Sequence, residues 1–145
     1  MKSRLIIIAL LAAALALAAS GCVLPMNTSS GRSTGSALLQ NGTFESESVQ
    51  LQAQDFIVYN VTADGGPVNM LFMDAAAYQQ YQDTVNGSGT GWKALVTVRN
   101  VTAGSFNYTV TQSGTYYTVI DNTGKVPGGA DGSNDVFVKT SCVYT

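Results

Sequence analysis

Apolar and polar side chains alternate along most of this chain, and this period of two constrains the fold more than any other feature. In Phe106–Thr111, the apolar residues Phe106, Tyr108 and Val110 alternate with Asn and Thr. Successive side chains of a β-strand point to opposite faces of a sheet, so the pattern is typical of half-buried strands. Ile57–Val61 shows the same alternation.

The alternating segments are short, and residues that favour turns separate them. Gly, Asn, Asp and Pro gather at residues 64–67, 86–89, 103–104, 113–114 and 124–134. The other predicted strands are Val49–Gln52, Val68–Met73, Trp92–Arg99, Thr115–Ile120 and Asp135–Tyr144. Strands at this spacing predict an all-β fold, an antiparallel β-sandwich of about seven or eight strands with Greek-key or jelly-roll-like connections.

One segment is predicted to be helical. Asp74 is a suitable N-cap for a short helix over Asp74–Asp83. Tyr78 and Tyr81 are three residues apart, so they share one face of this helix, and we expect that face to pack onto the sheet.

Two apolar residues in and next to the predicted strand Ile57–Val61 fall on its solvent-facing side. The alternation points Phe56 and Val58 outward, beside Asn60. We therefore expect these two side chains to need a partner or a cover.

The N-terminus has the three parts of an export signal. Lys2 and Arg4 are followed by a 15-residue apolar run, Leu5–Ala19, which is short for a membrane span. Ala19-Ser20-Gly21-Cys22 then resembles the lipobox of prokaryotic lipoproteins, although Ala19 stands where that motif more often has Leu. The resemblance implies that Met1–Cys22 is a signal peptide and that Cys22 is lipidated.

Two other interpretations stay open, namely a secreted protein cut by the general signal peptidase and an uncleaved signal helix that anchors the chain. Cys142 is the only other cysteine. With lipid on Cys22 it has no partner in the chain, whereas an unlipidated Cys22 allows a disulfide in an oxidising compartment. Without histidine to activate it, Cys142 is expected to be a small buried hydrophobe.

The segment after Cys22 is predicted to be a flexible tether over residues 23–36, because its Ser, Thr and Gly cannot bury much apolar area. Its reach is on the order of 20 Å. The β-sandwich domain is then expected over residues 37–145.

Six of the nine asparagines lie in Asn-x-Ser/Thr sequons, which exceeds what chance gives. We expect N-glycosylation of an exported protein, although Thr-rich strands with Asn in their turns also generate such sequences. In combining frequent sequons with a lipobox, this chain resembles archaeal envelope proteins, which are widely N-glycosylated. The six are Asn27, Asn41, Asn60, Asn86, Asn100 and Asn107.

A Gly-x-Tyr sequence at Gly114-Thr115-Tyr116 indicates a tyrosine corner, in which the Tyr hydroxyl bonds back to nearby backbone. The surrounding Thr109–Asn122 resembles the closing strands of secreted β-sandwich modules of the pre-peptidase C-terminal and Golgi-dynamics (GOLD) kinds. The resemblance covers residues 54–122 and implies an accessory or binding module rather than an enzyme.

Composition excludes several functions. The chain has no His, which removes His-dependent catalytic dyads, His-ligated metals and a histidine switch. Its net charge of -2 lacks the basic character of a nucleic-acid binder. Without Lys2 and Arg4, 5 basic and 9 acidic residues leave -4. The acids mostly fall at predicted turns, where Asp usually closes the turn rather than serving catalysis.

The only cofactor candidate is Ca²⁺. Asp131, Ser133 and Asp135 place oxygen atoms at alternate positions of a Gly-rich loop, an arrangement that Ca²⁺ accepts, and Asp121 and Asn122 of the neighbouring predicted strand are candidates to complete the site. A solvated loop without metal is the other interpretation.

The aromatic residues allow a carbohydrate-binding platform, with Trp92 and Tyr117 as its candidates. The competing interpretation is that both rings pack inside the fold. Tyr116 and Tyr117 are adjacent and must point to opposite faces of their strand.

These observations predict a non-catalytic, lipid-anchored and N-glycosylated module at the outer face of the cytoplasmic membrane, with a structural or protein-interaction role in the envelope. The alternative is a carbohydrate- or Ca²⁺-binding accessory module of an extracellular enzyme or transporter. An exposed apolar patch around Phe56 and Val58 favours the first, and a concave surface lined by Trp92 and tyrosines favours the second.

Overall fold

The computed structural model describes residues 30–145. The predicted signal peptide Met1–Cys22, the lipidation site Cys22, the sequon at Asn27 and residues 23–29 of the predicted tether lie outside the described residues.

Eight strands and one helix make up the described chain. The strands are β1 (Gly31–Leu39), β2 (Thr43–Leu51), β3 (Phe56–Asp64), β4 (Val68–Asp74), β5 (Val96–Val101), β6 (Ala103–Thr109), β7 (Gly114–Asn122) and β8 (Val136–Tyr144). The helix is α1 (Ala75–Val85), between β4 and β5.

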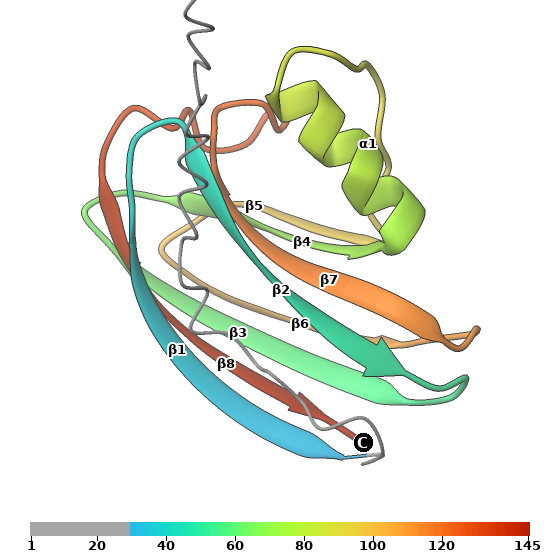
Figure 1. Ribbon diagram of the computed structural model, residues 1–145. Coiled ribbons are helices and arrows are strands. Elements are labelled where there is room, and N and C mark those ends of the chain that lie inside the picture. Colours follow the sequence, from blue (N-terminus) through green and yellow to red (C-terminus); the bar gives the residue numbers. More distant parts are fainter. Residues whose placement is uncertain (1–29) are drawn as a thin grey trace, which may run out of the picture.

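The strands form two four-stranded antiparallel sheets that face each other (Figure 1). Sheet A has the order β1-β8-β3-β6, and sheet B has the order β2-β7-β4-β5. Every connection except β4–α1–β5 crosses from one sheet to the other, which is the arrangement of a jelly roll. The predicted antiparallel β-sandwich is therefore confirmed.

The predicted tether is wrong over residues 31–36, which belong to β1. Their register with β8 runs without a break from Gly31 opposite Tyr144 to Leu39 opposite Val136. Backbone pairing orders this strand, so it does not need the apolar side chains whose absence suggested a flexible segment. Glycine is also required at position 31, because a Cβ there would collide with the Tyr144 ring.

Other strand ends also differ from the prediction. β2 begins at Thr43 rather than Val49, because its polar first half pairs along its whole length with β7. β5 begins at Val96, and the preceding Trp92 lies in a loop. The predicted turn at residues 103–104 is part of β6 instead.

The main core lies between the two sheets, and the predicted tyrosine corner closes one end of it. The Tyr116 hydroxyl donates to the Gln112 carbonyl at 2.7 Å, which confirms the corner. The Tyr116 ring is buried in this core and stacks on Phe72, with ring centroids 5.3 Å apart. Tyr117, on the opposite face of β7, is half-buried.

Helix α1 covers the outer face of sheet B (Figure 1). Asp74 caps it as predicted, because its carboxylate accepts from the Ala77 amide at 2.8 Å. Tyr81 is buried against the sheet with Leu71 and Val119, which confirms the expected packing. Among residues 30–145, no helix is long and apolar enough to cross a membrane.

A buried carboxylate joins this helix to the sheet. Asp121 on β7 has 0% exposure and accepts hydrogen bonds from three side chains. The Tyr81 and Thr123 hydroxyls each donate to Oδ1 at 2.5 Å, and Asn69 Nδ2 donates to Oδ2 at 2.9 Å. Burial and the adjacent carboxylate raise the pKa of Tyr81, which keeps its hydroxyl protonated as a donor.

Asn69 extends this network to two further segments. Its Oδ1 accepts from the backbone amides of Asn100 at 3.0 Å and Ala130 at 2.8 Å. Gly129 lies so close to the Asn69 amide that a Cβ there would collide with it. The network therefore fixes the end of β5 and the β7–β8 loop as well as α1.

We expect Tyr81→Phe to lower the free energy of unfolding by about 1.5–3 kcal/mol, because it removes a buried hydrogen bond to a charged group. Urea denaturation followed by circular dichroism measures the change. Tyr78→Phe is the control, since Tyr78 bonds to the neutral Ser46 hydroxyl and its loss should cost less. Equal losses in the two variants would contradict the special role of the Asp121 contact.

Candidate interaction surface

The outer face of sheet A carries most of the exposed apolar residues of the described chain. No described helix lies over this face, in contrast to the outer face of sheet B. Five large apolar side chains are exposed among the described residues. One of them, Leu95, lies in the loop before β5, and the other four lie on sheet A. The four on sheet A are Leu38, Phe56, Phe137 and Val143.

Two of these residues form what we call the distal patch, defined as Leu38 and Phe137. They lie directly opposite each other on β1 and β8 and are 61% and 41% exposed. Asp64 of β3 lies opposite Phe137 on its other side. The pair is at the end of sheet A where β1 finishes and β8 begins.

A second apolar group, the basal patch, lies at the other end of the same face and consists of Phe56, Val58 and Val143. Val58 is half-buried and lies opposite Val143, and Arg32 of β1 lies opposite Val143 on its other side. The prediction that Phe56 and Val58 point outward is confirmed, since Phe56 is 39% exposed and Val58 alternates with the buried Ile57 and Tyr59.

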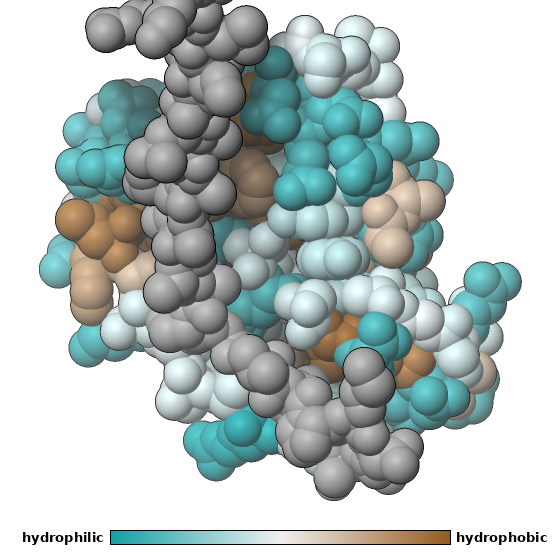
Figure 2. All heavy atoms as spheres, viewed as in Figure 1, coloured by the Kyte–Doolittle hydropathy of each residue, from teal (hydrophilic) through white to brown (hydrophobic). Residues whose placement is uncertain are grey.

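Polar residues separate the two patches. Asn60 of β3 lies between Ser141 of β8 and Ser105 of β6, and its Nδ2 donates to the Ser141 hydroxyl at 3.1 Å. Lys139 and Thr62 form the next row. From the side shown in Figure 2, the described surface is mostly polar, with apolar residues in separate spots. Each patch is therefore a small, distinct contact surface.

The described sequons lie on the surface, as glycosylation requires. Asn41, Asn86, Asn100 and Asn107 are exposed, and Asn60 is half-buried on β3. Asn107 of β6 lies opposite Val58, so it shares the outer face of sheet A with the patches, as the alternation predicted. Attachment of glycans to these residues stays a prediction.

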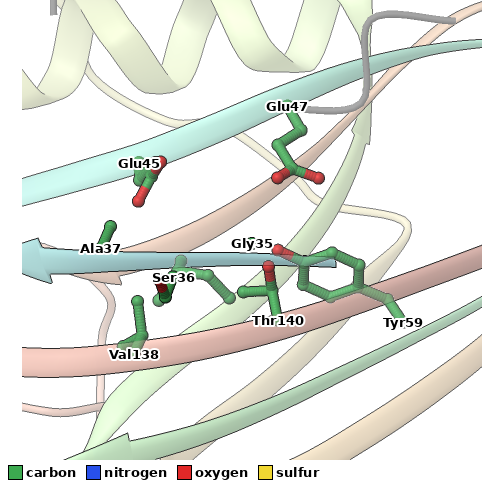
Figure 3. Close-up of a pocket in the computed structure, with 9 residues that line it drawn as sticks. Gly35, Ser36, Ala37, Glu45, Glu47, Tyr59, Val138 and Thr140 are labelled. Carbon is green, nitrogen blue, oxygen red and sulfur yellow. The ribbon is translucent and has the colours of Figure 1, made fainter. Parts of the chain in front are cut away.

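Sequence reasoning missed a pair of inward-pointing acids at the open edge between β1 and β2. Figure 3 shows Glu45 and Glu47 extending from β2 toward β1, with Glu47 above the hydroxyls of Tyr59 and Thr140 and Glu45 above Ala37. The free space between them is about 10 Å³, room for roughly one water molecule. Counting back in steps of two from the buried Leu51 and Val49 would have found these two positions.

The electrostatics of this edge follow from its burial. Burial raises the pKa of Glu45 above its ordinary value. Burial, followed by the nearby Glu47 charge, raises the pKa of Tyr59. An acid that points inward on an edge strand discourages another strand from pairing there, so Glu45 and Glu47 protect the edge of sheet B.

The candidate Ca²⁺ ligands are engaged within the protein. Asp131 Oδ1 accepts from the amide and hydroxyl of Ser133, which lowers the pKa of Asp131. Asp135 Oδ1 accepts from the Asn41 amide at 2.8 Å. Asp121 does not join them, because it lies in the buried network under α1.

Within residues 30–145, no group of three or more His, Cys, Asp or Glu is placed to hold a metal ion. Of the three candidate Ca²⁺ ligands, Asp131 and Asp135 are acids and Ser133 is neutral. Binding of Ca²⁺ by these residues stays a prediction.

The two candidate sugar-binding rings do not form a common platform. Tyr117 stacks on Tyr78 of α1, with centroids 3.9 Å apart and the planes 9° from parallel. Trp92 meets Tyr81 edge to face at 5.3 Å. Each ring is half-buried against a different residue of the helix, so packing explains both better than sugar binding does.

Cys142 is buried with 3% exposure in the core between the sheets. Its thiol is free. The expectation that it acts as a small buried hydrophobe on the last strand is confirmed.

Comparisons with known proteins identify no family. No protein-family model and no curated protein matches the chain. Among solved structures, Aeromonas hydrophila PliG, a periplasmic inhibitor of g-type lysozyme, is 14% identical, with a TM-score of 0.49 over 84% of this chain and 91% of that one. A structure described as Bacillus endospore appendages that form disulfide-linked pili is 13% identical, with a TM-score of 0.44 over 79% and 84%. At these identities, neither likeness bears on function.

We expect Glu45→Gln to stabilise the protein at pH 7. A carboxyl whose pKa is raised by folding destabilises the folded state once it ionises, so stability falls as the pH rises from about the unfolded pKa of 4.5 through the folded one. Gln removes this loss. The melting temperature of the variant should exceed that of the native protein at pH 7, and the gap should shrink toward pH 4. A constant gap would contradict this account.

Proposed function

We propose that the protein is a lipid-anchored, N-glycosylated and non-catalytic module of the cell envelope that binds another protein through the distal patch. The observation that carries this proposal is the difference between the two outer faces of the sandwich. The chain covers the outer face of sheet B with α1, whereas Leu38 and Phe137 stay exposed on sheet A. Contiguous exposed apolar surface with a polar rim is typical of contact sites, whereas scattered single apolar residues are ordinary.

The geometry of the chain supports attachment at the opposite end from this patch. β1 begins at Gly31, near the basal patch, and finishes at Leu39, next to the distal patch. A lipid on Cys22 would therefore hold the domain by its basal end. The seven steps of extended strand from Gly31 to Leu38 would place Leu38 roughly 23 Å further from the attachment point.

The sequons on this face are compatible with a partner at the distal patch. Asn107 lies on β6, the edge of sheet A opposite to β1, and shares a row with Val58 of the basal patch. Glycans on Asn107 and Asn60 would lie over β6 and β3, which leaves the β1–β8 pair of Leu38 and Phe137 accessible. They would also supply the solubility that a chain with only 11% charged residues otherwise draws from Ser, Thr and Asn.

The inward acids give no support to catalysis. Glu45 and Glu47 face a space for about one water molecule, and a glycosidase needs its two carboxyls on either side of a sugar. We therefore assign them to the protection of the β2 edge.

Intact-mass spectrometry of the protein from its native cells tests the anchor and the glycans together. We expect a chain that begins at Cys22, carries a lipid and shows sugar increments. Cys22→Ser should remove the lipid mass, and Asn107→Gln should remove one glycan increment. The mass of the unmodified full chain would overturn both assignments.

A photo-crosslinking amino acid at position 137 tests the distal patch. In intact cells, benzoyl-phenylalanine in place of Phe137 should give one discrete crosslinked species, because this ring lies at the proposed contact. The same amino acid in place of Gln79, an exposed residue of α1, is the matched control and should give none. Equal crosslinking from the two positions, or none from position 137, would contradict the proposal.

A further inference from the structure

We propose that the apolar segment Val23–Met26 of this same chain binds to the basal patch and so fixes the orientation of the domain on its anchor. The inference deepens the proposed function and rests on it, because lipidation of Cys22 sets where the segment begins. The basal patch is a different surface from the distal patch, and its proposed occupant is a segment of this chain rather than another protein.

The chain enters sheet A beside the basal patch. The described chain begins at Ser30, and β1 starts at Gly31 opposite Tyr144. The next residue, Arg32, lies opposite Val143 of the basal patch, which in turn lies opposite Val58. The chain therefore enters the domain at the row of side chains that forms the patch.

The residues between Met26 and Ser30 are long enough to reach the patch. Neighbouring strands are about 4.8 Å apart, so the path from β1 across β8 to β3 is roughly 10 Å. The three residues Asn27–Ser29 span at most about 10 Å when extended. Val23–Met26 can thus lie over Val143 and Val58, and it ends one strand short of the sequon at Asn107.

The segment and the patch are both apolar. Val23, Leu24 and Met26 are apolar and uncharged, and Pro25 has no amide hydrogen that would need a backbone partner on the face of a sheet. The patch offers apolar surface, with Phe56 39% and Val143 36% exposed. Both groups lose contact with water when they meet, which is favourable.

A lipid surface fits the patch less well than this segment. Arg32 lies opposite Val143 in the strand register, and Asp55 precedes Phe56 in the sequence. These two charges are opposite in sign, and the chain after Cys22 carries a net charge of -4. An anionic membrane therefore gains little attraction from this face. The segment is also joined to the domain by a few residues, which raises its effective concentration at the patch.

Cysteine accessibility in the full-length protein tests the proposal. We would introduce Val143→Cys together with Cys142→Ala, in detergent micelles, and follow the labelling rate with a polar maleimide. If the segment covers the patch nine-tenths of the time, labelling should be about tenfold faster in a Leu24→Ser, Met26→Ser background. Lys139→Cys, on the same strand and face, is the matched control, and its rate should not depend on the segment.

The remaining outcomes distinguish other occupants. Equal and fast labelling in both backgrounds would show an open patch, and equal and slow labelling would show another cover. Protection that appears only in phosphatidylglycerol vesicles and survives the double substitution would assign the patch to the membrane. Each of these results overturns the proposal. The mass of the N-terminal peptide reports lipid on Cys22 separately, so failure of the anchor and failure of the docking are told apart.

Discussion

The structure on the outer side of sheet B depends on one buried charge. Asp121 has 0% exposure, and an ionised carboxylate taken out of water must be given donors. Those donors come from α1, from β4 and from the β7–β8 loop, through Tyr81, Asn69 and Thr123. Each segment is held in place because the others complete the same set of hydrogen bonds. A local change in one of them is therefore felt in all three.

This arrangement gives the two faces of the sandwich different roles. The outer face of sheet B is used to hold the domain together, since the helix and the long loop are packed on it. The outer face of sheet A has no such cover within the described chain, and its apolar residues fall into two small patches at opposite ends. A face with two separate patches suits two separate contacts, one with a partner and one with the N-terminal segment.

Sequence predicted the sandwich, the helix and the tyrosine corner because each depends on local signals: alternation, an N-cap at Asp74, and the spacing of Gly114 and Tyr116. It missed β1, since a Ser/Thr/Gly strand has no apolar pattern and is ordered only by pairing with a strand far away in sequence. The inward direction of Glu45 and the burial of Asp121 were missed for a related reason. Acids at strand ends usually face water, and only tertiary contacts show the exceptions.

The pairing of β1 with β8 has a consequence for the order in which the domain is made. Gly31 at the start of β1 lies opposite Tyr144 at the end of β8, and β8 also separates β1 from β3 in sheet A. Until the C-terminal strand emerges from the ribosome, β1 has no neighbour and the remainder of sheet A is only the β3–β6 pair. Such long-range pairing makes folding slow. Sheet A is complete only when β1 meets β8, so the formation of this sheet depends on the two strands that lie furthest apart along the described chain.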